Sequence, residues 1–500
     1  MNIHTSVIKY TQQRVNSFIF TLAGLLAVSL LFSSCEDYLG DDTNIDPNRP
    51  AEITLEAYLP TLADATAESH YYVAFQANQV AQQLASYFAA GADIHEEFRI
   101  GTGWTFLYLR NMANARELGE QAAEQESPHY AGVAKIYQAI GLGLATDSWE
   151  NVPFSQAFQG IEELTPDYDQ QSTIYETLIP NLLDEAIADL QAQSSISSPG
   201  SDDVIYGGNL DQWIKTANVL KARYAIHLTN KGAQQAATNA LSALSGLSYE
   251  SNDDDFQLAY DERNLNPWHA RVALAINTGN FTVAPGAQLV NMMNGELYNV
   301  FDPRLPLMVT LGVDDTEYEG MVNGSEGGNT VDLRDNAWYT SSEAPLLMVT
   351  YAEAKFIEAE AQFLANGGSA TSVGSTEAAY QAYLTGIEAH MDKLGVDEEE
   401  KQAYLANPNV AAGANGLTLG LILKEKYIAL FLNPEAWVDL RRYDYSDQLY
   451  QGLTLPENHN PQLGGEFIQR ASYPFDELSR NSQAVTANNK ELAADMWRDQ

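Results

Sequence analysis

The stretch that most constrains the fold runs from Ile422 to Tyr445 and reads ILKEKYIALFLNPEAWVDLRRYDY. Apart from the charged residues at 424–426, its first half is apolar on nearly every face of a helix, so we expect that helix to be buried. Asn433 and Pro434 follow it. Because Asn is a good N-cap and Pro fits the first helical position, the stretch predicts two helices joined by a tight corner inside the protein.

Charged residues in the second half of this stretch are expected to form an internal ion network. Asp439 can reach Arg442 three positions further along the helix, and we expect Glu435 to pair with Arg441 if both are buried. Buried charges in proteins are normally paired for structural reasons. We therefore interpret the corner as structural and assign no catalysis to it.

The amino terminus has the pattern of a secretory signal. Lys9 and Arg14 precede an uncharged run at Phe18–Phe32, and small residues then lead to Cys35. A basic segment, an apolar run of this length and small residues at its end are typical of a signal peptide rather than a membrane span. We expect the signal to occupy residues 1–34 and the mature chain to start at the cysteine.

Cys35 is the only cysteine of the sequence, so no intramolecular disulfide can form. Its place directly after the apolar run indicates a lipid attachment point rather than a nucleophile. The segment that follows, residues 35–50, is acidic and rich in turn formers, and we expect a solvated tether. Its alternating Asp and Asn resemble a calcium loop, but Pro47 and Ile53 stand where Gly and Glu are needed, which excludes an EF-hand.

Composition excludes some classes of partner. The chain has 26 Lys and Arg against 67 Asp and Glu, a formal net charge of −41. Such a charge argues strongly against nucleic acid or anionic lipid as a ligand, because both would be repelled. With 45% hydrophobic residues in 500, the chain can bury a large core, in either one helical body or two subdomains.

Helical periodicity dominates both ends of the mature chain. We expect the first group of helices at Leu55–Ala90, Trp104–Gln125, Tyr130–Thr146, Thr173–Gln193 and Leu210–Lys231. After Met348 the period returns in two helices separated by a Gly/Ser turn, with Phe356 on the buried face of the first and Tyr383 on that of the second. Helix pairs of this length are typical of tetratricopeptide repeats, so the sequence predicts an all-α fold of stacked hairpins.

The middle of the chain, Tyr249–Ala344, loses this period and gains Gly and Asn, which predicts a loop-rich, irregular insertion. Recognition residues are often carried by such loops. Trp268, Trp338 and Tyr339 lie here among polar residues, and we expect them to be exposed platforms for stacking on sugar rings, with Asn266 binding hydroxyl groups. The sequence therefore predicts the ligand on this face.

No catalytic or metal-binding constellation stands out. His95-Glu96-Glu97 is not a zinc-protease motif because residue 99 is Arg, and none of the eight histidines has metal-ligand spacing with another. We therefore expect no metal and no cofactor. A helical glycoside hydrolase would need two carboxylates across a cleft, and among so many acids no pair can be singled out. An adhesin or scaffold built from helical repeats also stays open.

Several motifs, in the right order along the chain, resemble the SusD/RagB family of outer-membrane nutrient-binding lipoproteins. Those in the corner are Lys426-Tyr427, Glu435-Ala436-Trp437 and Arg441-Arg442, although the family more often has Trp at the position of Tyr427. Others are the hairpin from Ala134 to Ala157, the helix from Trp213 to Tyr224, Asn266-Pro267-Trp268, and Tyr473-Pro474 with Glu477 and Asn481. The residues before Cys35 resemble a bacterial lipobox with Phe32 at its first position.

This resemblance implies one large domain at 51–500, made of tetratricopeptide-like hairpins with the loop-rich insertion at about 249–344. It implies a lipoprotein on the extracellular face of the outer membrane, held by lipid on Cys35. Such a protein would capture oligosaccharides and deliver them to a TonB-dependent SusC-like transporter, without catalysis of its own. A peptide ligand, as in RagB-like members, is the alternative that the resemblance leaves open.

Overall fold

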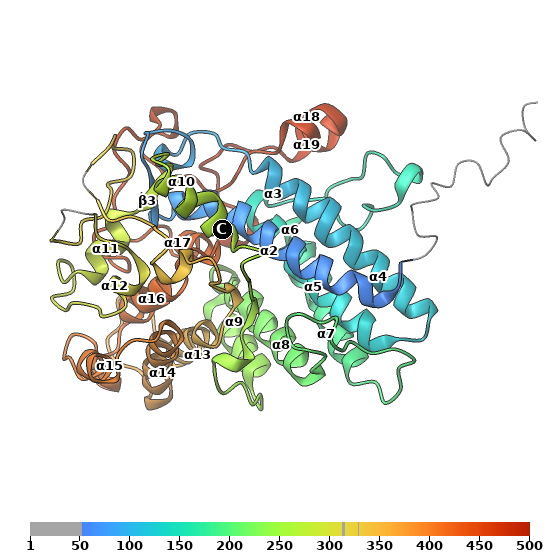
Figure 1. Ribbon diagram of the computed structural model, residues 1–500, viewed down its shortest axis with the longest axis horizontal. Coiled ribbons are helices and arrows are strands. Elements are labelled where there is room, and N and C mark those ends of the chain that lie inside the picture. The colour runs from blue at the N-terminus through green and yellow to red at the C-terminus, as the bar shows by residue number, and fades with distance from the viewer. Residues whose placement is uncertain (1–52, 313–315, 329) are drawn as a thin grey trace, which may run out of the picture. The chain divides into compact units, whose positions relative to one another are not determined.

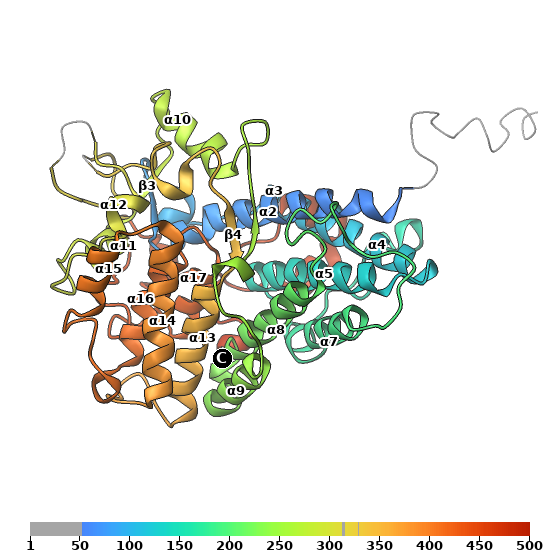
Figure 2. The ribbon, with the colours of Figure 1, turned by 60° about the horizontal axis from the view of Figure 1, so that its bottom comes forward.

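Helices account for most of the residues that this computed structural model describes, which are 53–312, 316–328 and 330–500. Leu55–Gln500 form one compact unit. Helix α2 (Leu55–Val80) runs across that unit. It extends from the hairpin of α4 (Ala113–Glu124) and α5 (Pro128–Trp149) to the segments around β3 (Val283–Pro285) and α11 (Ala287–Met293) (Figures 1 and 2). The prediction of a helical fold built from hairpins is confirmed.

The amino-terminal hairpins begin with helices that pack against α2. They comprise α3 (Gly101–Thr105), which continues through a π-helical turn (Phe106–Met112) into α4 (Ala113–Glu124), then α5 (Pro128–Trp149), α6 (Gln171–Thr173), α7 (Ile179–Leu190), α8 (Leu210–Ile226) and α9 (Thr229–Leu244). Helix α5 is buried along nearly its whole length. Gly143 lets α8 approach it, because a Cβ there would overlap the hydroxyl of Tyr224.

The carboxyl-terminal hairpin consists of α13 (Tyr351–Ala365) and α14 (Glu377–Leu394), which lie side by side in Figure 2. It is followed by α15 (Glu398–Leu405), α16 (Leu419–Ala429) and α17 (Glu435–Arg442), and the chain ends with α18 (Phe475–Arg480) and α19 (Ser482–Asn488). The side chains of Thr350, Thr376 and Thr418 accept hydrogen bonds from the first turns of α13, α14 and α16. These caps satisfy amide groups that have no partner within the helix.

The irregular middle region contains only short elements. They are β2 (Phe256–Leu258), a π-helical turn (His269–Ala273) leading into α10 (Leu274–Asn277), β3 (Val283–Pro285), α11 (Ala287–Met293) and α12 (Leu305–Met308), with β4 (Leu346–Val349) just after it. Strand β2 pairs antiparallel with β4, and β3 pairs antiparallel with β1 (Leu84–Ser86). Each pairing joins segments that are far apart in the sequence.

Two predicted helix boundaries were wrong. The helix expected at Leu55–Ala90 ends at Val80, because the chain turns through Gln82, whose φ is +59°, and then forms β1. The helix expected at Leu210–Lys231 is divided at His227 and Leu228 into α8 and α9. No described helix is both long enough and apolar enough to cross a bilayer.

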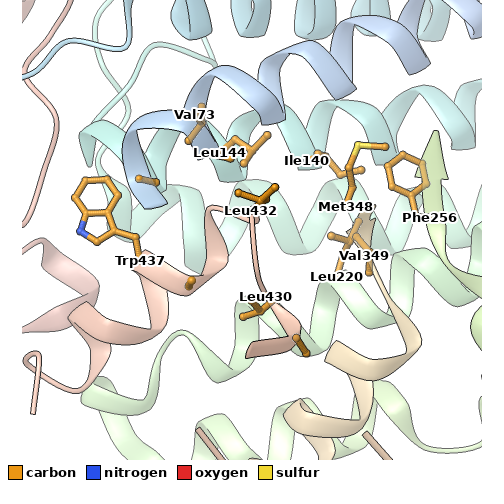
Figure 3. Packing of buried hydrophobic residues seen from close by; sticks show 14 of the residues in the cluster. Val73, Ile140, Leu144, Leu220, Phe256, Met348, Val349, Leu430, Leu432 and Trp437 are labelled. Atoms are coloured by element: carbon orange, nitrogen blue, oxygen red, sulfur yellow. The ribbon is translucent and has the colours of Figure 1, made fainter. Parts of the chain in front are cut away.

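The corner between α16 and α17 lies in the core, as the sequence predicted. Figure 3 shows Leu432 and Trp437 of the corner near Val73 of α2 and Leu144 of α5, all of them buried. Leu432 adopts a left-handed conformation with φ of +60°, and the side chain of Asn433 accepts a hydrogen bond from the amide of Glu435 at 3.1 Å. The close turn follows from these local features together with burial on all sides.

The corner also holds the end of α2. The Tyr427 hydroxyl donates to the carbonyl of Ala81 at 2.7 Å, and the Gln83 side chain donates to the carbonyl of Tyr427 at 2.6 Å. The same Gln83 side chain accepts from the amide of Leu432 at 3.2 Å. Three hydrogen bonds therefore join residues just after α2 to a segment more than three hundred positions later.

Charged residues of the corner form a buried ion network with Glu360 of α13. Glu360 bonds to Arg442 at 2.7 Å, and Asp439 lies 2.6 Å from Arg442 and 2.9 Å from Lys426. The expected pairing of Asp439 with Arg442 is confirmed. All four side chains are buried, so the charges are compensated by one another instead of by water.

The expected pairing of Glu435 with Arg441 is wrong. Glu435 instead lies 3.0 Å from His227 and 3.6 Å from Arg223 on α8, because it faces the amino-terminal hairpins. Arg441 donates to the carbonyl groups of Trp437 and Gln469. Burial lowers the pKa of Arg441 to about 10, as expected for a guanidinium held mainly by neutral carbonyls.

Candidate ligand-binding site

A cleft of about 400 Å³ opens beside the carboxyl-terminal end of α2, where the helix meets β1 and β3. Its walls come from three parts of the chain: the last turns of α2, the segment after β1, and the segment that leads into β3. The lining residues are Phe75, Gln76, Gln79, Ser86, Phe88, Ala90, Gly91, Ala92, Asn280, Phe281, Thr282 and Val283. We call this set the aromatic cleft.

Strand pairing brings two walls of the cleft together. Ser86 of β1 is paired with Val283 of β3, and the amide of Tyr87 donates to the carbonyl of Thr282 at 3.2 Å. The rings of Tyr87 and Phe281 pack with their centroids 5.1 Å apart. The position of Phe281 beside the segment that carries Phe88 therefore depends on backbone hydrogen bonds.

The aromatic side chains of the cleft are phenylalanines. Phe88 is 70% exposed, whereas Phe75 and Phe281 are half-buried and pack against the core. A large apolar ring that is mostly exposed at the edge of a cleft is a candidate for contact with a ligand. The seven tryptophans of the chain all lie in the described residues, and each is buried or half-buried.

Polar groups of the cleft are amides and hydroxyls. Gln76 and Asn280 contribute amides, and Ser86 and Thr282 contribute hydroxyls. The Oγ1 atom of Thr282 is buried and forms no hydrogen bond with any described residue. All twelve lining residues lie in the described part of the chain, and none carries an ionisable side chain. The cleft therefore offers hydrogen bonds without charge.

Asp93 fixes the wall of the cleft from behind. It is fully buried one position after Ala92, and its carboxylate accepts from the Asn323 side chain at 2.6 Å and from the amide of Gly324 at 2.7 Å. Burial raises the pKa of Asp93 to about 6, against the effect of these hydrogen bonds, which lower it. The turn after β1 is thus tied to the segment around Gly324.

Two of the larger clefts lie between the amino-terminal helices and have a different lining. One, of about 660 Å³, lies between α4, α5 and α7, and its Lys135–Asp189 and Arg116–Glu120 pairs already satisfy one another. The other, of about 450 Å³, lies between α7, α8 and α9 and includes Lys221, which is paired with Asp184. Neither of these two combines an exposed aromatic ring with uncharged polar groups.

A third cleft, of about 420 Å³, has Phe301, 47% exposed, beside Asn299 and Asn407, but Glu400 also lines it. The aromatic cleft, whose lining carries no charge and whose Phe88 is 70% exposed, is therefore the better candidate.

Sequence comparison decides the family. The family model described as "Starch-binding associating with outer membrane", of the SusD-like type, matches residues 47–474. This chain belongs to the SusD-like family. The resemblance predicted from its motifs is therefore confirmed. No functionally curated protein matches the chain.

Solved structures of SusD-like proteins share the fold. A chitin-binding protein is 23% identical, with a TM-score of 0.71 over 89% of this chain and 99% of that one. A SusD/RagB family protein from Bacteroides thetaiotaomicron is 22% identical, with a TM-score of 0.72 over 90% and 99%. A chitin-binding SusD homologue from Flavobacterium johnsoniae is 19% identical, with a TM-score of 0.70 over 89% and 98%. At these identities the likeness establishes the fold alone.

Trp268, predicted as the main stacking residue of this SusD-like chain, lies beneath the cleft. It is only 2% exposed, so the expectation of an exposed platform is wrong. Its ring packs edge-on against Tyr71, with centroids 4.8 Å apart, and lies 6.3 Å from Phe75. Trp268 therefore supports Phe75, a residue that lines the cleft, from the core side.

Asn266 is also buried, and its side chain is fully used within the protein. Its amide donates to the carbonyl of Ala344 at 2.8 Å, and its oxygen accepts from the backbone of Trp268 at 2.7 Å. These bonds fix the start of the π-helical turn at His269–Ala273. The side chain that the sequence analysis expected to bind sugar hydroxyls is therefore bonded inside the protein instead.

Trp338 and Tyr339 lie together away from the lining of the aromatic cleft. Tyr339 is 5% exposed, contrary to the prediction, and its hydroxyl bonds to Nε2 of His390 at 2.8 Å. Trp338 is half-buried and packs edge-on against Tyr339, with centroids 4.8 Å apart. Burial lowers the pKa of His390, which keeps this histidine neutral as a hydrogen-bond partner.

The loop-rich region contributes to the cleft, but through residues that the sequence did not single out. Asn280, Phe281 and Thr282 belong to the predicted ligand face, whereas Phe88 fell inside a predicted helix. Cys35, the signal at 1–34 and the tether at 35–50 lie outside the described residues. Among the residues that are described, no group of three or more His, Cys, Asp or Glu side chains could hold a metal ion.

Proposed function

We propose that this protein is a cell-surface lipoprotein that binds oligosaccharides in the aromatic cleft and delivers them to a TonB-dependent SusC-like outer-membrane transporter. The observation that carries the proposal is the combination of the exposed ring of Phe88 with uncharged hydrogen-bonding groups in one cleft. Membership of a family described as starch-binding and associated with the outer membrane supports it. So do the chitin-binding names of two structural neighbours.

The chemistry of the cleft suits a sugar. The face of an aromatic ring can cover the apolar C–H groups of a pyranose, and amides and hydroxyls can bond to its hydroxyls. Gln76 and Asn280 each provide both a donor and an acceptor. Recognition of this kind needs no catalytic group, so we propose binding without turnover.

Replacing Phe88 with alanine should weaken binding of an oligosaccharide about ten- to a hundredfold. We take stacking on a nucleobase, worth about 1–3 kcal/mol, as the guide to stacking on a sugar. Because Phe88 is 70% exposed, the melting temperature should change little. Screening the soluble protein on a glycan array identifies the ligand, and isothermal titration of both proteins with that ligand measures the change.

The matched control is Phe475→Ala. Phe475 is 72% exposed but lies on α18, outside the cleft lining, so this variant should bind like the wild type. If wild type and Phe88→Ala bind the oligosaccharide with equal affinity, the aromatic cleft is not the binding site. Capture of peptides in place of glycans would favour the RagB-like alternative, and release of reducing sugar by the pure protein would favour a hydrolase.

Anchoring is tested at Cys35. We expect the wild-type protein to fractionate with the outer membrane and Cys35→Ala to appear in the soluble fraction, because the several acyl chains of a bacterial lipoprotein bind membranes firmly whereas a protein without them does not. Protease added to intact cells should digest the wild type if it faces outward. A Cys35→Ala protein that stays with the membrane would contradict lipid anchoring at this residue.

A further inference from the structure

The side chains of the aromatic cleft provide nothing to neutralise a charged ligand. Its polar lining consists of Gln76, Gln79, Ser86, Asn280 and Thr282, within a lining of twelve described residues that includes no Lys, Arg or His. Recognition of carboxylate or sulfate groups usually depends on Arg or Lys, which form charge-assisted hydrogen bonds. An anionic group in this cleft would therefore lose water without gaining a cation.

Basic side chains near the cleft are already paired with acids. Arg271 lies 2.8 Å from Glu68 and stacks on Tyr71, the neighbour of Phe75 in the ring cluster under the cleft. On another side, Arg334 lies 2.7 Å from Asp332. The Tyr87 hydroxyl also donates to that aspartate, at 2.7 Å. These pairs carry no net charge that could attract an anion.

Asp93 is the charged group behind the cleft wall that lacks such compensation. Its partners are the side-chain amide of Asn323 and the backbone amides of Gly324 and Ser86, and all three are neutral. It follows Ala92, which lines the cleft, and it is fully buried. With a pKa of about 6 it is mostly ionised at neutral pH, so the wall has a negative charge behind it that water screens weakly.

The charge of the whole chain acts in the same direction. A formal net charge of −41 gives the protein a surrounding field that repels anions and attracts cations. This long-range effect is screened by salt over about 10 Å at 0.1 M. The lack of a cation within the cleft, by contrast, is a property of the contact itself and persists at high salt.

We infer that the aromatic cleft selects uncharged glycans and rejects those that carry carboxylate or sulfate groups. This inference rests on the proposed function, and it narrows the ligand class of the same site. Two effects would contribute to this selectivity. Phe88 and the amides would hold a neutral sugar, whereas an acidic sugar would place an unpaired negative charge near the buried carboxylate of Asp93. The protein would therefore bind neutral glycan chains and leave acidic ones unbound.

The test compares matched probes. Neutral malto- and chito-oligosaccharides, each alongside the same oligosaccharide oxidised to the carboxylate at its primary hydroxyls, are titrated into the soluble protein at about 0.05 M and about 0.5 M salt. We expect the neutral probe that binds to show the same affinity at both salt concentrations. Its oxidised form should bind at least about tenfold more weakly even at the higher concentration, where long-range repulsion is screened.

A gain-of-function variant tests the cause. Asn280 is exposed at the cleft, so Asn280→Lys should raise the ratio of oxidised to neutral affinity at least about tenfold, with the increase reduced by salt. The control Asn407→Lys places the same charge outside the aromatic cleft and should leave that ratio unchanged.

The outcomes separate the two proposals. If the oxidised probe binds as tightly as the neutral one at high salt, or if Asn280→Lys leaves the ratio unchanged, selection against charge by the cleft is wrong while glycan binding stands. If no neutral glycan binds, or if Phe88→Ala binds it as well as the wild type, the proposed site fails and the inference fails with it.

Discussion

Replacing Trp268 with alanine will lower the free energy of unfolding by about 3–5 kcal/mol, the usual cost of removing a fully buried large aromatic side chain. Trp268 is 2% exposed and packs between Tyr71 and Phe75, so its removal leaves a cavity that these rings cannot refill without moving. Urea denaturation followed by circular dichroism measures the loss. Glycan affinity should also fall, since Phe75 would lose its support.

Trp338→Ala is the control for this experiment. It removes the same side chain from a half-buried position in the same irregular region, so the loss of stability should be smaller. Its effect on glycan affinity should be negligible, because Trp338 does not line the aromatic cleft. A Trp268→Ala protein with unchanged urea denaturation but weaker glycan binding would instead mean that Trp268 touches the ligand, as its sequence context suggested.

Replacing Glu360 with alanine should cost a similar amount, about 3–5 kcal/mol, for a different reason. Glu360 is fully buried and compensates Arg442 at 2.7 Å and Lys426 at 3.4 Å. Its loss would leave the two buried cations to share the carboxylate of Asp439. The control is Glu358→Ala on the same helix, where an accessible pair with Lys355 should contribute no more than about 1 kcal/mol.

The ion network also predicts a pH dependence. Burial alone would raise the pKa of Glu360, but Arg442 and Lys426 outweigh it, so the pKa lies below its ordinary value, and the pKa of Asp439 is lowered in the same way. The stabilisation is therefore present at neutral pH and is lost as the pH falls through these lowered values. Acidification should narrow the stability difference between wild type and Glu360→Ala; a constant difference would contradict the network.

Features encoded locally could be predicted from the sequence. The corner at 422–445 was predicted correctly because apolar residues cover nearly every face of its first helix and because Asn433 and Pro434 specify a turn. The partner of Glu435 could not be predicted, since His227 and Arg223 approach it from a helix two hundred positions earlier. The expectation of a pair with Arg441 rested on burial of both charges, but the fold offered Glu435 other partners.

The aromatic cleft could not be predicted for the same reason. It depends on β1 and β3, strands of three residues each that show no period of their own and pair across about two hundred positions. The sequence placed Phe88 inside a long helix. That helix ends instead at a turn through Gln82, where no Gly, Pro or Asn marks a turn in the sequence. Aromatic residues in an irregular segment were expected at the surface, but Trp268 is buried because its ring packs against Tyr71 on α2.

The hydrogen bonds between Gln83 and Tyr427 set an order of assembly for the site. The segment that frames the cleft after α2 is held by residues that leave the ribosome more than three hundred positions later. Until then Gln83 has neither Tyr427 nor Leu432 to bond with, and β1 emerges from an unsupported turn. A chain still being synthesised therefore lacks the hydrogen bonds that hold this segment of the cleft. We therefore expect competence to bind to appear only once the corner has closed.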